Sequence, residues 1–287
     1  MASNPTVSPL VDVFLAWGES ARWDERRQRL YCVDCATNRL CWLEEGRPPL
    51  HSMPVPSLPT GMALTGDDRL VLALDDGLHV VDTERRTTEA LATYPEGLGR
   101  ANDLNADLDG NLVTGTLNLA GGPGSYWWFS SRSGWVLLDE GIGNANGPVV
   151  LEVDGRMTLV FADTTANRIY AYDYDGRIGR VGQRRTLSDT TELGGAPDGA
   201  CADGQAGVWS CILGPGRVVR LRGDRVDCSV DVGVSLPSDV TFGGPDLDRM
   251  FVTSIASGTD PASASGGQVV LVEGTGFTGR PEPRFVL

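Results

Sequence analysis

The sequence contains no lysine, because all 24 of its basic residues are arginine. A Schiff-base lysine, a P-loop lysine and a pyridoxal-phosphate lysine are therefore excluded. Only two histidines occur, His51 and His79, which excludes a histidine-rich zinc site and leaves only these two for a Ser-His-Asp triad. Acidic residues give a net charge of -14. Such a surface repels phosphate backbones and anionic membranes, so we expect no nucleic-acid or membrane partner.

Long apolar runs are also missing, since none approaches the roughly 20 residues that span a bilayer. The N-terminal MASNPTVSPL lacks the basic and apolar regions of a signal peptide, and we expect a cytoplasmic protein. Cys32 and Cys35 have a C-x-x-C spacing typical of redox or zinc motifs. Their segment alternates like a strand, in which residues three apart point to opposite faces. Buried free thiols are therefore the simpler interpretation.

Helical periodicity is nearly absent, whereas short β-rich runs between glycine and proline turns recur along the chain. Six units of about 45 residues match the four-stranded blades of a β-propeller. The units open at Leu30, Leu70, Leu112, Leu159, Val208 and Met250. We predict an all-β protein with a single domain over residues 1–287, a six-bladed β-propeller of four-stranded blades around a central channel. Pairing of the early VDVFLA with the final RFVL would close the ring within one blade.

A further short segment precedes each unit, and we interpret it as the innermost strand of a blade. Four of these segments carry a polar residue at nearly the same distance before the opening of the unit: Glu19, Asn102, Asn146 and Asp198. Equal positions in the repeat mean equal heights in the ring, so these side chains are predicted to converge on the channel axis. Asp198 lies in Pro-Asp-Gly, which also allows an ordinary turn. The turn interpretation does not predict this convergence.

Convergence of Glu19, Asn146 and Asp198 would bring together two carboxylates and one amide oxygen. Facing carboxylates repel each other, and a divalent cation removes the repulsion. An all-oxygen set favours Ca²⁺, Mg²⁺ or Mn²⁺ and also allows Zn²⁺. Three protein ligands leave positions for water or substrate, as in catalytic sites. The sequence therefore predicts one divalent metal ion in a working site.

Six stretches resemble the gluconolactonase, regucalcin, senescence-marker-protein and LRE-like family, in order and over essentially the whole chain. They are WGESARWDERRQRLYCVD, RANDLNADLDGNLVTGTL, NGPVVLEVDGRMTLVFAD, PDGACADGQAGVWSC, LPSDVTFGGPDLDRMFVTS and GRPEPRFVL. This family is a six-bladed propeller with a divalent metal in its channel, and many members hydrolyse sugar lactones. The resemblance implies metal ligands at Glu19, Asn146 and Asp198 and substrate contacts at Arg100 and Asn102.

The resemblance implies a lactonase-like carboxylic ester hydrolase that opens a lactone, a sugar lactone first of all, to a hydroxy acid. Asp198 is the first candidate for the general base, and Asp103 is the second. Two alternatives stay open: the same metal scaffold acting on another ester, a phosphotriester or a biosynthetic intermediate, and a non-catalytic metal-binding propeller. We expect a small-molecule substrate and no obligate protein partner.

Three departures from the family pattern concern the site. Ser-Ala follows Glu19, where the family usually has Gly-Pro. The stretch GIGNANGP, which contains Asn146, is longer than the usual form. The stretch GTLNLAGGPGSYWW lacks the carboxylate that some members use as a substrate contact. The metal ligands are thus retained, whereas the substrate pocket differs.

Overall fold

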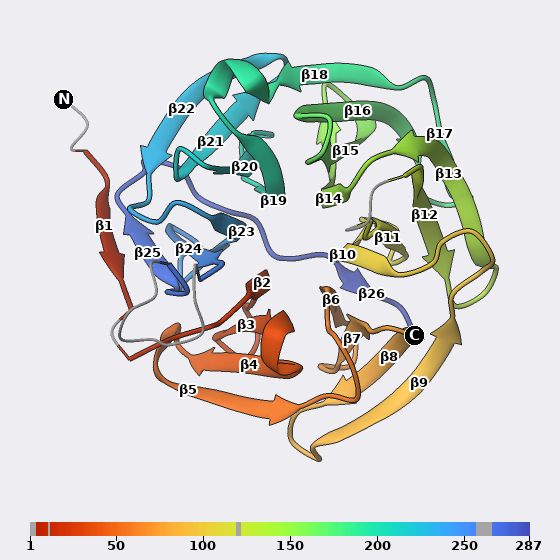
Figure 1. The fold of residues 1–287 in the computed structure, drawn as a ribbon, viewed down its shortest axis with the longest axis horizontal. Helices are drawn as coiled ribbons and strands as arrows, with labels where there is room; N and C mark the ends of the chain where they lie inside the picture. Colours follow the sequence, from red (N-terminus) through yellow and green to blue (C-terminus); the bar gives the residue numbers. More distant parts are fainter. Residues whose placement is uncertain (1–3, 11, 119–121, 257–265) are drawn as a thin grey trace.

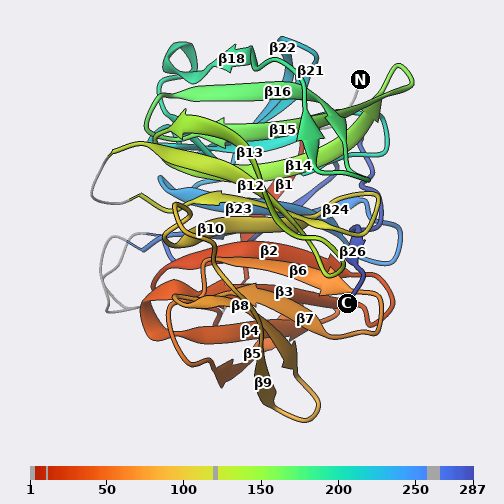
Figure 2. The same ribbon diagram turned by 90° about the vertical axis from the view of Figure 1, so that its right-hand side faces the viewer.

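Six antiparallel sheets form a closed ring around a central channel in the computed structural model, which confirms the predicted six-bladed β-propeller (Figure 1). Figure 2 shows the same ring from the side. The structure describes residues 4–10, 12–118, 122–256 and 266–287. The innermost strands of the six blades are β2 (Gly18–Asp24), β6 (Gly61–Thr65), β10 (Ala101–Ala106), β14 (Ala145–Val153), β19 (Ala196–Ala202) and β23 (Pro237–Gly243).

The other strands follow outward in each blade. The second strands are β3 (Arg29–Asp34), β7 (Leu70–Ala73), β11 (Leu112–Thr116), β15 (Arg156–Asp163), β20 (Val208–Leu213) and β24 (Arg249–Ser254). The third strands are β4 (Arg39–Glu44), β8 (Gly77–Asp82), β12 (Gly124–Ser130), β16 (Arg168–Asp175), β21 (Arg217–Arg222) and β25 (Val270–Glu273). The outermost strands are β5 (Arg47–Pro54), β9 (Thr87–Thr93), β13 (Gly134–Ile142), β18 (Arg185–Asp189), β22 (Arg225–Asp231) and β1 (Thr6–Pro9).

Short elements complete the secondary structure. The two-residue strand β17 (Arg180–Val181) pairs with β16, and β26 (Arg284–Phe285) pairs with β6. The described residues include two 3-10 helices, η1 (Cys35–Thr37) and η2 (Thr190–Leu193). No helix in the described part of the chain is long and apolar enough to cross a membrane.

The N-terminal strand β1 closes the ring by pairing with β25 in the last blade. The predicted pairing of VDVFLA with RFVL is wrong, although residue 11 of the first segment lies outside the described residues. Val13 and Leu15 of this segment are instead buried in the apolar cluster between the last and first blades. The strand β26, which lies within RFVL, runs parallel to β6 of the second blade.

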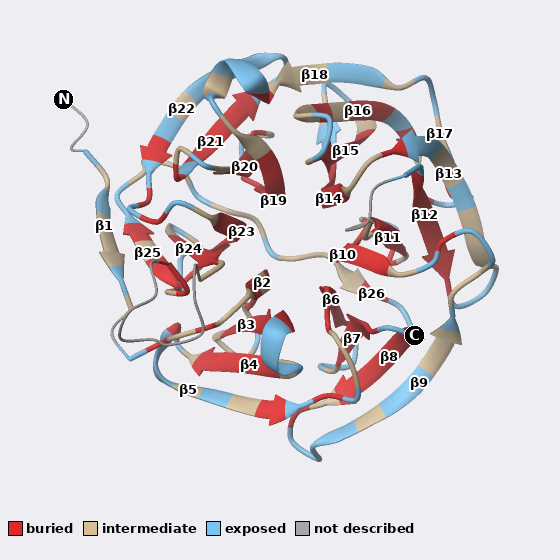
Figure 3. Cartoon of the chain, viewed as in Figure 1, coloured by how far each residue is buried: buried red, intermediate tan, exposed pale blue. Residues whose placement is uncertain are grey.

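Apolar side chains pack between neighbouring blades and leave the channel to polar residues. Trp23 of the first blade stacks on Phe251 of the last, with ring centroids 5.5 Å apart. Tyr126 of the third blade stacks on Phe161 of the fourth at 3.7 Å. Figure 3 shows that the innermost strands are largely buried and the outermost strands largely exposed. Burial of apolar surface contributes roughly 25 cal/mol per Å², so contacts between blades hold the ring.

The C-terminal segment, residues 274–285, crosses one end of the channel (Figure 1). Gly279 N donates to the carbonyl of Leu247, in the turn after β23. The carboxylate of Glu282 accepts a hydrogen bond of 2.9 Å from the Thr241 hydroxyl near the end of β23. The segment therefore covers the end at which the innermost strands finish.

All six cysteines are free thiols, and Cys228 alone is not fully buried. Cys32 lies opposite Cys41 in the pairing of β3 with β4. The thiol of Cys35 donates to the Pro59 carbonyl at 2.9 Å. The C-x-x-C spacing is therefore part of the packing of the first blade.

Candidate active site

Five of the six innermost strands carry an irregularity at the same level of the channel. The pairing with the second strand is interrupted after Glu19, Ala101, Asn146, Pro197 and Pro237. The strand β6 pairs with β7 without such a shift. A β-bulge inserts an extra residue and re-aims the side chains that follow it. The five bulges thus change the direction of side chains at one level around the channel.

Asp198 lies at one of these bulges. Pro197, Asp198 and Gly199 are inside β19, so the interpretation of Asp198 as an ordinary turn residue is wrong. The residue is 4% exposed, and among the described residues no hydrogen bond reaches its carboxylate. Burial raises the pKa of Asp198 well above its ordinary value, and the charges of Asp103 and Asp239 raise it further. A buried carboxylate without a donor is costly unless a cation or a proton joins it.

Glu19 lies near Asp198 in the channel. Burial raises the pKa of Glu19 well above its ordinary value, and repulsion by Asp198 is the next largest cause. One donor partly offsets this repulsion, since the indole Nε1 of Trp17 donates to Glu19 Oε1 at 3.2 Å. The charge of Asp198 therefore destabilises the charged form of Glu19.

The side chain of Asn146 is fixed by hydrogen bonds at both atoms of its amide group. Its Nδ2 donates to the Thr164 hydroxyl at 2.7 Å, and its Oδ1 accepts from Asn102 Nδ2 at 2.7 Å. The Thr164 hydroxyl in turn donates to the Pro197 carbonyl at 2.7 Å. This chain of bonds ties the strand of Asn146 to the strand of Asp198.

The residues that follow Glu19 and Asn146 both have a left-handed backbone. Gly147 has a φ of 52°, and a Cβ there would lie 2.8 Å from the Asp198 carbonyl oxygen. Ser20, at the corresponding position of β2, has a φ of 53°. Glycine takes this conformation at little cost, whereas serine is an uncommon residue for it. The hydroxyl of Ser20 donates to the Thr60 carbonyl at 3.3 Å. The departure from the family's Gly-Pro is therefore accommodated within the same bulge.

A second layer of charge, which the sequence analysis missed, contains Arg22 and Asp239. Arg22 is 1% exposed, and its guanidinium forms ion pairs of 3.0 Å with Asp103 and 2.7 Å with Asp239. Asp103 also accepts hydrogen bonds from Leu104 N at 2.9 Å and from Gly147 N at 3.0 Å. Three donors therefore hold the Asp103 carboxylate.

Arg100 lies at the rim, where its guanidinium is 2.9 Å from the carboxylate of Asp75. Its side chain is 39% exposed. His51 and His79 lie on β5 and β8, outside the innermost strands. His79 is 2.8 Å from the Asp76 carboxylate. The structure thus brings Glu19, Asn102, Asp103, Asn146 and Asp198 together in the channel and directs Arg100 toward Asp75.

The channel residues fit a divalent cation that prefers oxygen. Asp198 offers a carboxylate without a donor, Glu19 a carboxylate with one donor, and Asn146 an oriented amide oxygen. Within the described ranges, no group of three or more His, Cys, Asp and Glu side chains is placed to hold a metal. The predicted set contains only two such residues, because its third member is an amide. Carboxylate and amide oxygens suit Ca²⁺ in particular.

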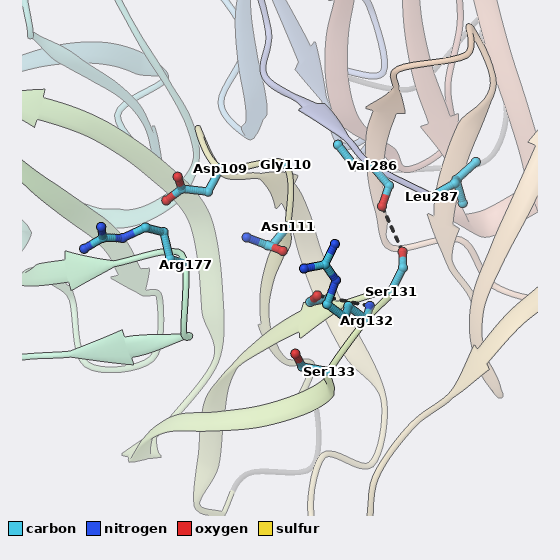
Figure 4. Close-up of a pocket in the computed structure, with 10 residues that line it drawn as sticks. Asp109, Gly110, Asn111, Ser131, Arg132, Ser133, Arg177, Val286 and Leu287 are labelled. Atoms are coloured by element: carbon cyan, nitrogen blue, oxygen red, sulfur yellow. Dashed lines mark hydrogen bonds between the residues drawn. The ribbon is translucent and has the colours of Figure 1, made fainter.

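A surface cleft of about 400 Å³ lies away from this site (Figure 4). Arg132 and Arg177 project on either side of Asn111 in this cleft. Asn111 belongs to the turn after β10, at the opposite end of that strand from Asn102. Arg177 is paired with Asp175 at 3.1 Å. The cleft is therefore separate from the channel residues.

The fold and the channel together define a six-bladed propeller with a polar site of carboxylates and amides at one end of its axis. The family model described as the SMP-30/Gluconolactonase/LRE-like region matches residues 17–256. The chain belongs to this family.

Relatives and solved structures agree with this assignment. The chain is 31% identical to pentonolactonase XacC of Haloferax volcanii, over 97% of this chain and 98% of that protein. It is 29% identical to regucalcin of Xenopus laevis, over 85% of this chain and 84% of that protein. The crystal structure of regucalcin from Agrobacterium tumefaciens, described as a calcium-binding protein, is similar with a TM-score of 0.86 and 26% identity, over 97% of each chain.

Proposed function

We propose that this chain is a lactonase that opens a sugar lactone to a hydroxy acid, with one divalent cation held by Glu19, Asn146 and Asp198. The observation that carries the proposal is the half-buried Glu19 carboxylate beside the buried Asp198 carboxylate. Burial raises the pKa of both groups, and the charge of Asp198 raises the pKa of Glu19 further. The substrate class follows from the family and from the relative named a pentonolactonase. Ca²⁺ is the first expected ion because the ligand set is all oxygen.

A bound divalent cation would polarise the lactone carbonyl and acidify water. The Asp198 carboxylate would take the proton from the water that attacks the carbonyl carbon. The ring C–O bond then breaks, and this proton passes to the departing ring oxygen, which becomes the hydroxyl of the hydroxy acid. Asp103 is a weaker candidate for the base because three donors already hold its carboxylate. It remains the second candidate.

Asn102 has one polar group left for the substrate. Its amide nitrogen donates to the Ala145 carbonyl at 2.8 Å and to Asn146 Oδ1 at 2.7 Å. Its Oδ1 is then available to accept a hydrogen bond from a sugar hydroxyl. Arg100 would orient an anionic or hydroxylated part of the substrate at the rim, in competition with Asp75. Because the C-terminal segment covers the other end of the channel, substrate would enter at the end where Asn102 and Asp198 lie.

The first test is metal content combined with a substrate panel. We expect about one divalent ion per purified chain by elemental analysis, and a higher Tm when Ca²⁺ is added to stripped protein, because a ligand that binds the folded state stabilises it. Sugar lactones should be hydrolysed faster than aliphatic lactones, aryl esters and phosphotriesters, in assays with Ca²⁺, Mg²⁺, Mn²⁺ and Zn²⁺.

The panel also tests the alternatives. Another substrate stays open because the stretch GTLNLAGGPGSYWW lacks the carboxylate that some family members use as a substrate contact. Residues 119–121 of this stretch lie outside the described residues. Faster turnover of aryl esters or phosphotriesters would replace the lactone assignment. Metal binding without hydrolysis of any panel member would favour a non-catalytic propeller. Absence of both bound metal and thermal shift would overturn the metal site.

Asn102→Ala should weaken substrate binding with the metal still in place, at saturating Ca²⁺ because Asn102 also donates to Oδ1 of the proposed ligand Asn146. Loss of one hydrogen bond to a sugar hydroxyl is worth about 1.5 kcal/mol, so KM should rise roughly tenfold with a smaller change in kcat. Steady-state kinetics and elemental analysis of the same sample measure both effects. Asn105→Ala is the matched control, because Asn105 is a buried asparagine farther along β10 that donates to the Pro148 carbonyl. An unchanged KM of the metal-saturated Asn102 variant, or an equal rise of KM in both variants, would contradict the substrate contact.

A further inference from the structure

We propose that Arg22 is a positioning residue that sets the geometry of the metal ligands from beneath the site. Its guanidinium would act through Asp103 and Asp239 on the strands that carry Glu19, Asn146 and Asp198. The inference rests on the proposed function, since it concerns the same ion. Arg22 lies three residues after Glu19 on the innermost strand β2 and is buried in the channel.

Every N–H group of the Arg22 guanidinium has an acceptor. Nε donates to Met62 O at 3.2 Å, Nη1 to Ala21 O and Asp239 Oδ2 at 2.7 Å each, and Nη2 to Asp103 Oδ1 at 3.0 Å and Leu104 O at 2.9 Å. These acceptors belong to β2, β6, β10 and β23, so one side chain joins the innermost strands of four blades. A guanidinium presents five donors in one rigid plane, which lysine cannot reproduce.

The carboxylates of Asp103 and Asp239 connect Arg22 to the two other ligand strands, β14 and β19. Asp103 Oδ2 accepts from the backbone N–H of Gly147, which directly follows Asn146. Asp239 lies against Gly199, which directly follows Asp198, so closely that a Cβ on Gly199 would be 2.3 Å from Asp239 Oδ1. The acids paired with Arg22 therefore each contact the backbone beside one proposed ligand. Groups that orient ligands from outside the coordination shell commonly change metal affinity by about 10–100-fold when removed.

The positioning role and a purely electrostatic role predict opposite changes in metal affinity. Arg22 is a cation close to several carboxylates, so by Coulomb's law alone its removal should tighten the binding of another cation. If Arg22 instead holds the ligand strands in place, its removal should weaken that binding. The sign of the change in Kd therefore separates the two roles.

Arg220 provides a matched control for the loss of a buried arginine. It is 1% exposed, and its guanidinium lies 2.5 Å from Asp203 and 2.5 Å from Asp227. It lies on β21, the third strand of its blade, outside the channel. Arg220→Met thus leaves two aspartates without their arginine partner, as Arg22→Met does. These aspartates do not lie beside the proposed ligands.

The experiment is a calorimetric titration of stripped full-length protein with Ca²⁺, repeated with Mn²⁺ and Zn²⁺, at a temperature where each variant is folded by circular dichroism. We expect Arg22→Met to raise Kd at least about tenfold, and Arg22→Lys, which keeps the charge but has fewer donors, to raise it about threefold or more. Arg220→Met should stay within about twofold of the wild type, because Asp203 lies beyond the end of β19 and Arg220 contacts none of the residues beside the proposed ligands.

Tighter or unchanged binding by a folded Arg22→Met variant would overturn the positioning role, and so would an equal loss in Arg220→Met. If Arg22→Met fails to fold, Arg22→Lys decides the matter, because wild-type affinity in that variant would overturn the proposal. A wild-type protein that binds none of the three ions would remove the proposed function and this inference together. Wild-type binding with unaffected Arg22 variants would remove this inference alone.

Discussion

Replacement of Asp198 by asparagine should lower kcat for lactone hydrolysis at least about a hundredfold, since loss of a general base costs roughly 10²–10⁴-fold. The substitution also removes one negative charge from the proposed ligand set, so metal binding should weaken and excess Ca²⁺ should restore activity only in part. The propeller should remain folded, because no hydrogen bond among the described residues depends on this carboxylate and its buried charge is unfavourable. Steady-state kinetics at increasing Ca²⁺, together with Tm, measure these effects.

Asp154→Asn is the matched control for this variant. Asp154 is exposed and lies with Gly155 in the turn between β14 and β15, where its φ is 50°. Asparagine serves such turn positions as well as aspartate does, so both hydrolysis and Tm should change little. Near-normal hydrolysis by a folded Asp198→Asn variant would contradict the role of Asp198 as ligand and base.

The fold was predictable because each blade repeats the same pattern of residue types. Alternating apolar strands and turn residues recur six times, and a closed ring of blades is an arrangement in which such a repeat leaves only short, protected edges. The place of the C-terminal strand was not predictable in the same way. β26 is a two-residue parallel strand, Arg284–Phe285, whose side chains are too few to show a period. Ion pairs of Arg284 with Asp24 and Glu25 of the neighbouring first blade hold it in place, and local sequence does not encode them.

The proposed ligands were found by their position in the repeat, and the same rule could have found Asp239. It precedes Met250 by the same number of residues as Glu19 precedes Leu30. Its segment also has the pattern of an innermost strand, with the aspartate at the position that Glu19 has in its own segment. Asp239 would then have joined the charged residues predicted for the channel.

Arg22 could not be found by this rule, because strand alternation places residues three apart on opposite faces. The bulge after Glu19 adds one residue to β2 and returns Arg22 to the channel side. Bulges are set by the twist and packing of the whole sheet, and a period of two in the sequence does not reveal them. The layer of charge beneath the ligands therefore emerges only from the structure.

Removal of the metal should abolish most of the hydrolysis and should make the stability of the protein depend on pH in a defined direction. Chelation should lower kcat at least about a hundredfold, because the cation would supply several kcal/mol of transition-state stabilisation. In the stripped protein the pKa values of Glu19 and Asp198 are raised above their ordinary values of 4.5 and 3.8. The folded state thus holds protons that the unfolded state has released, so Tm should fall as pH rises above these values toward the raised ones.

The stabilisation by bound metal should have the opposite pH dependence, since the metal binds the ionised carboxylates. The rise in Tm produced by saturating Ca²⁺ should therefore be larger at pH 8 than at pH 5, and the apparent Kd should fall over the same range. Thermal scans with chelator and with Ca²⁺ at several pH values give this difference directly, and groups remote from the site cancel because they titrate alike in both series. In a Glu19→Gln, Asp198→Asn double variant the difference should shrink toward zero at every pH. A Ca²⁺-induced shift in the wild type that is equal at pH 5 and pH 8 would show that these two carboxylates do not bind the ion.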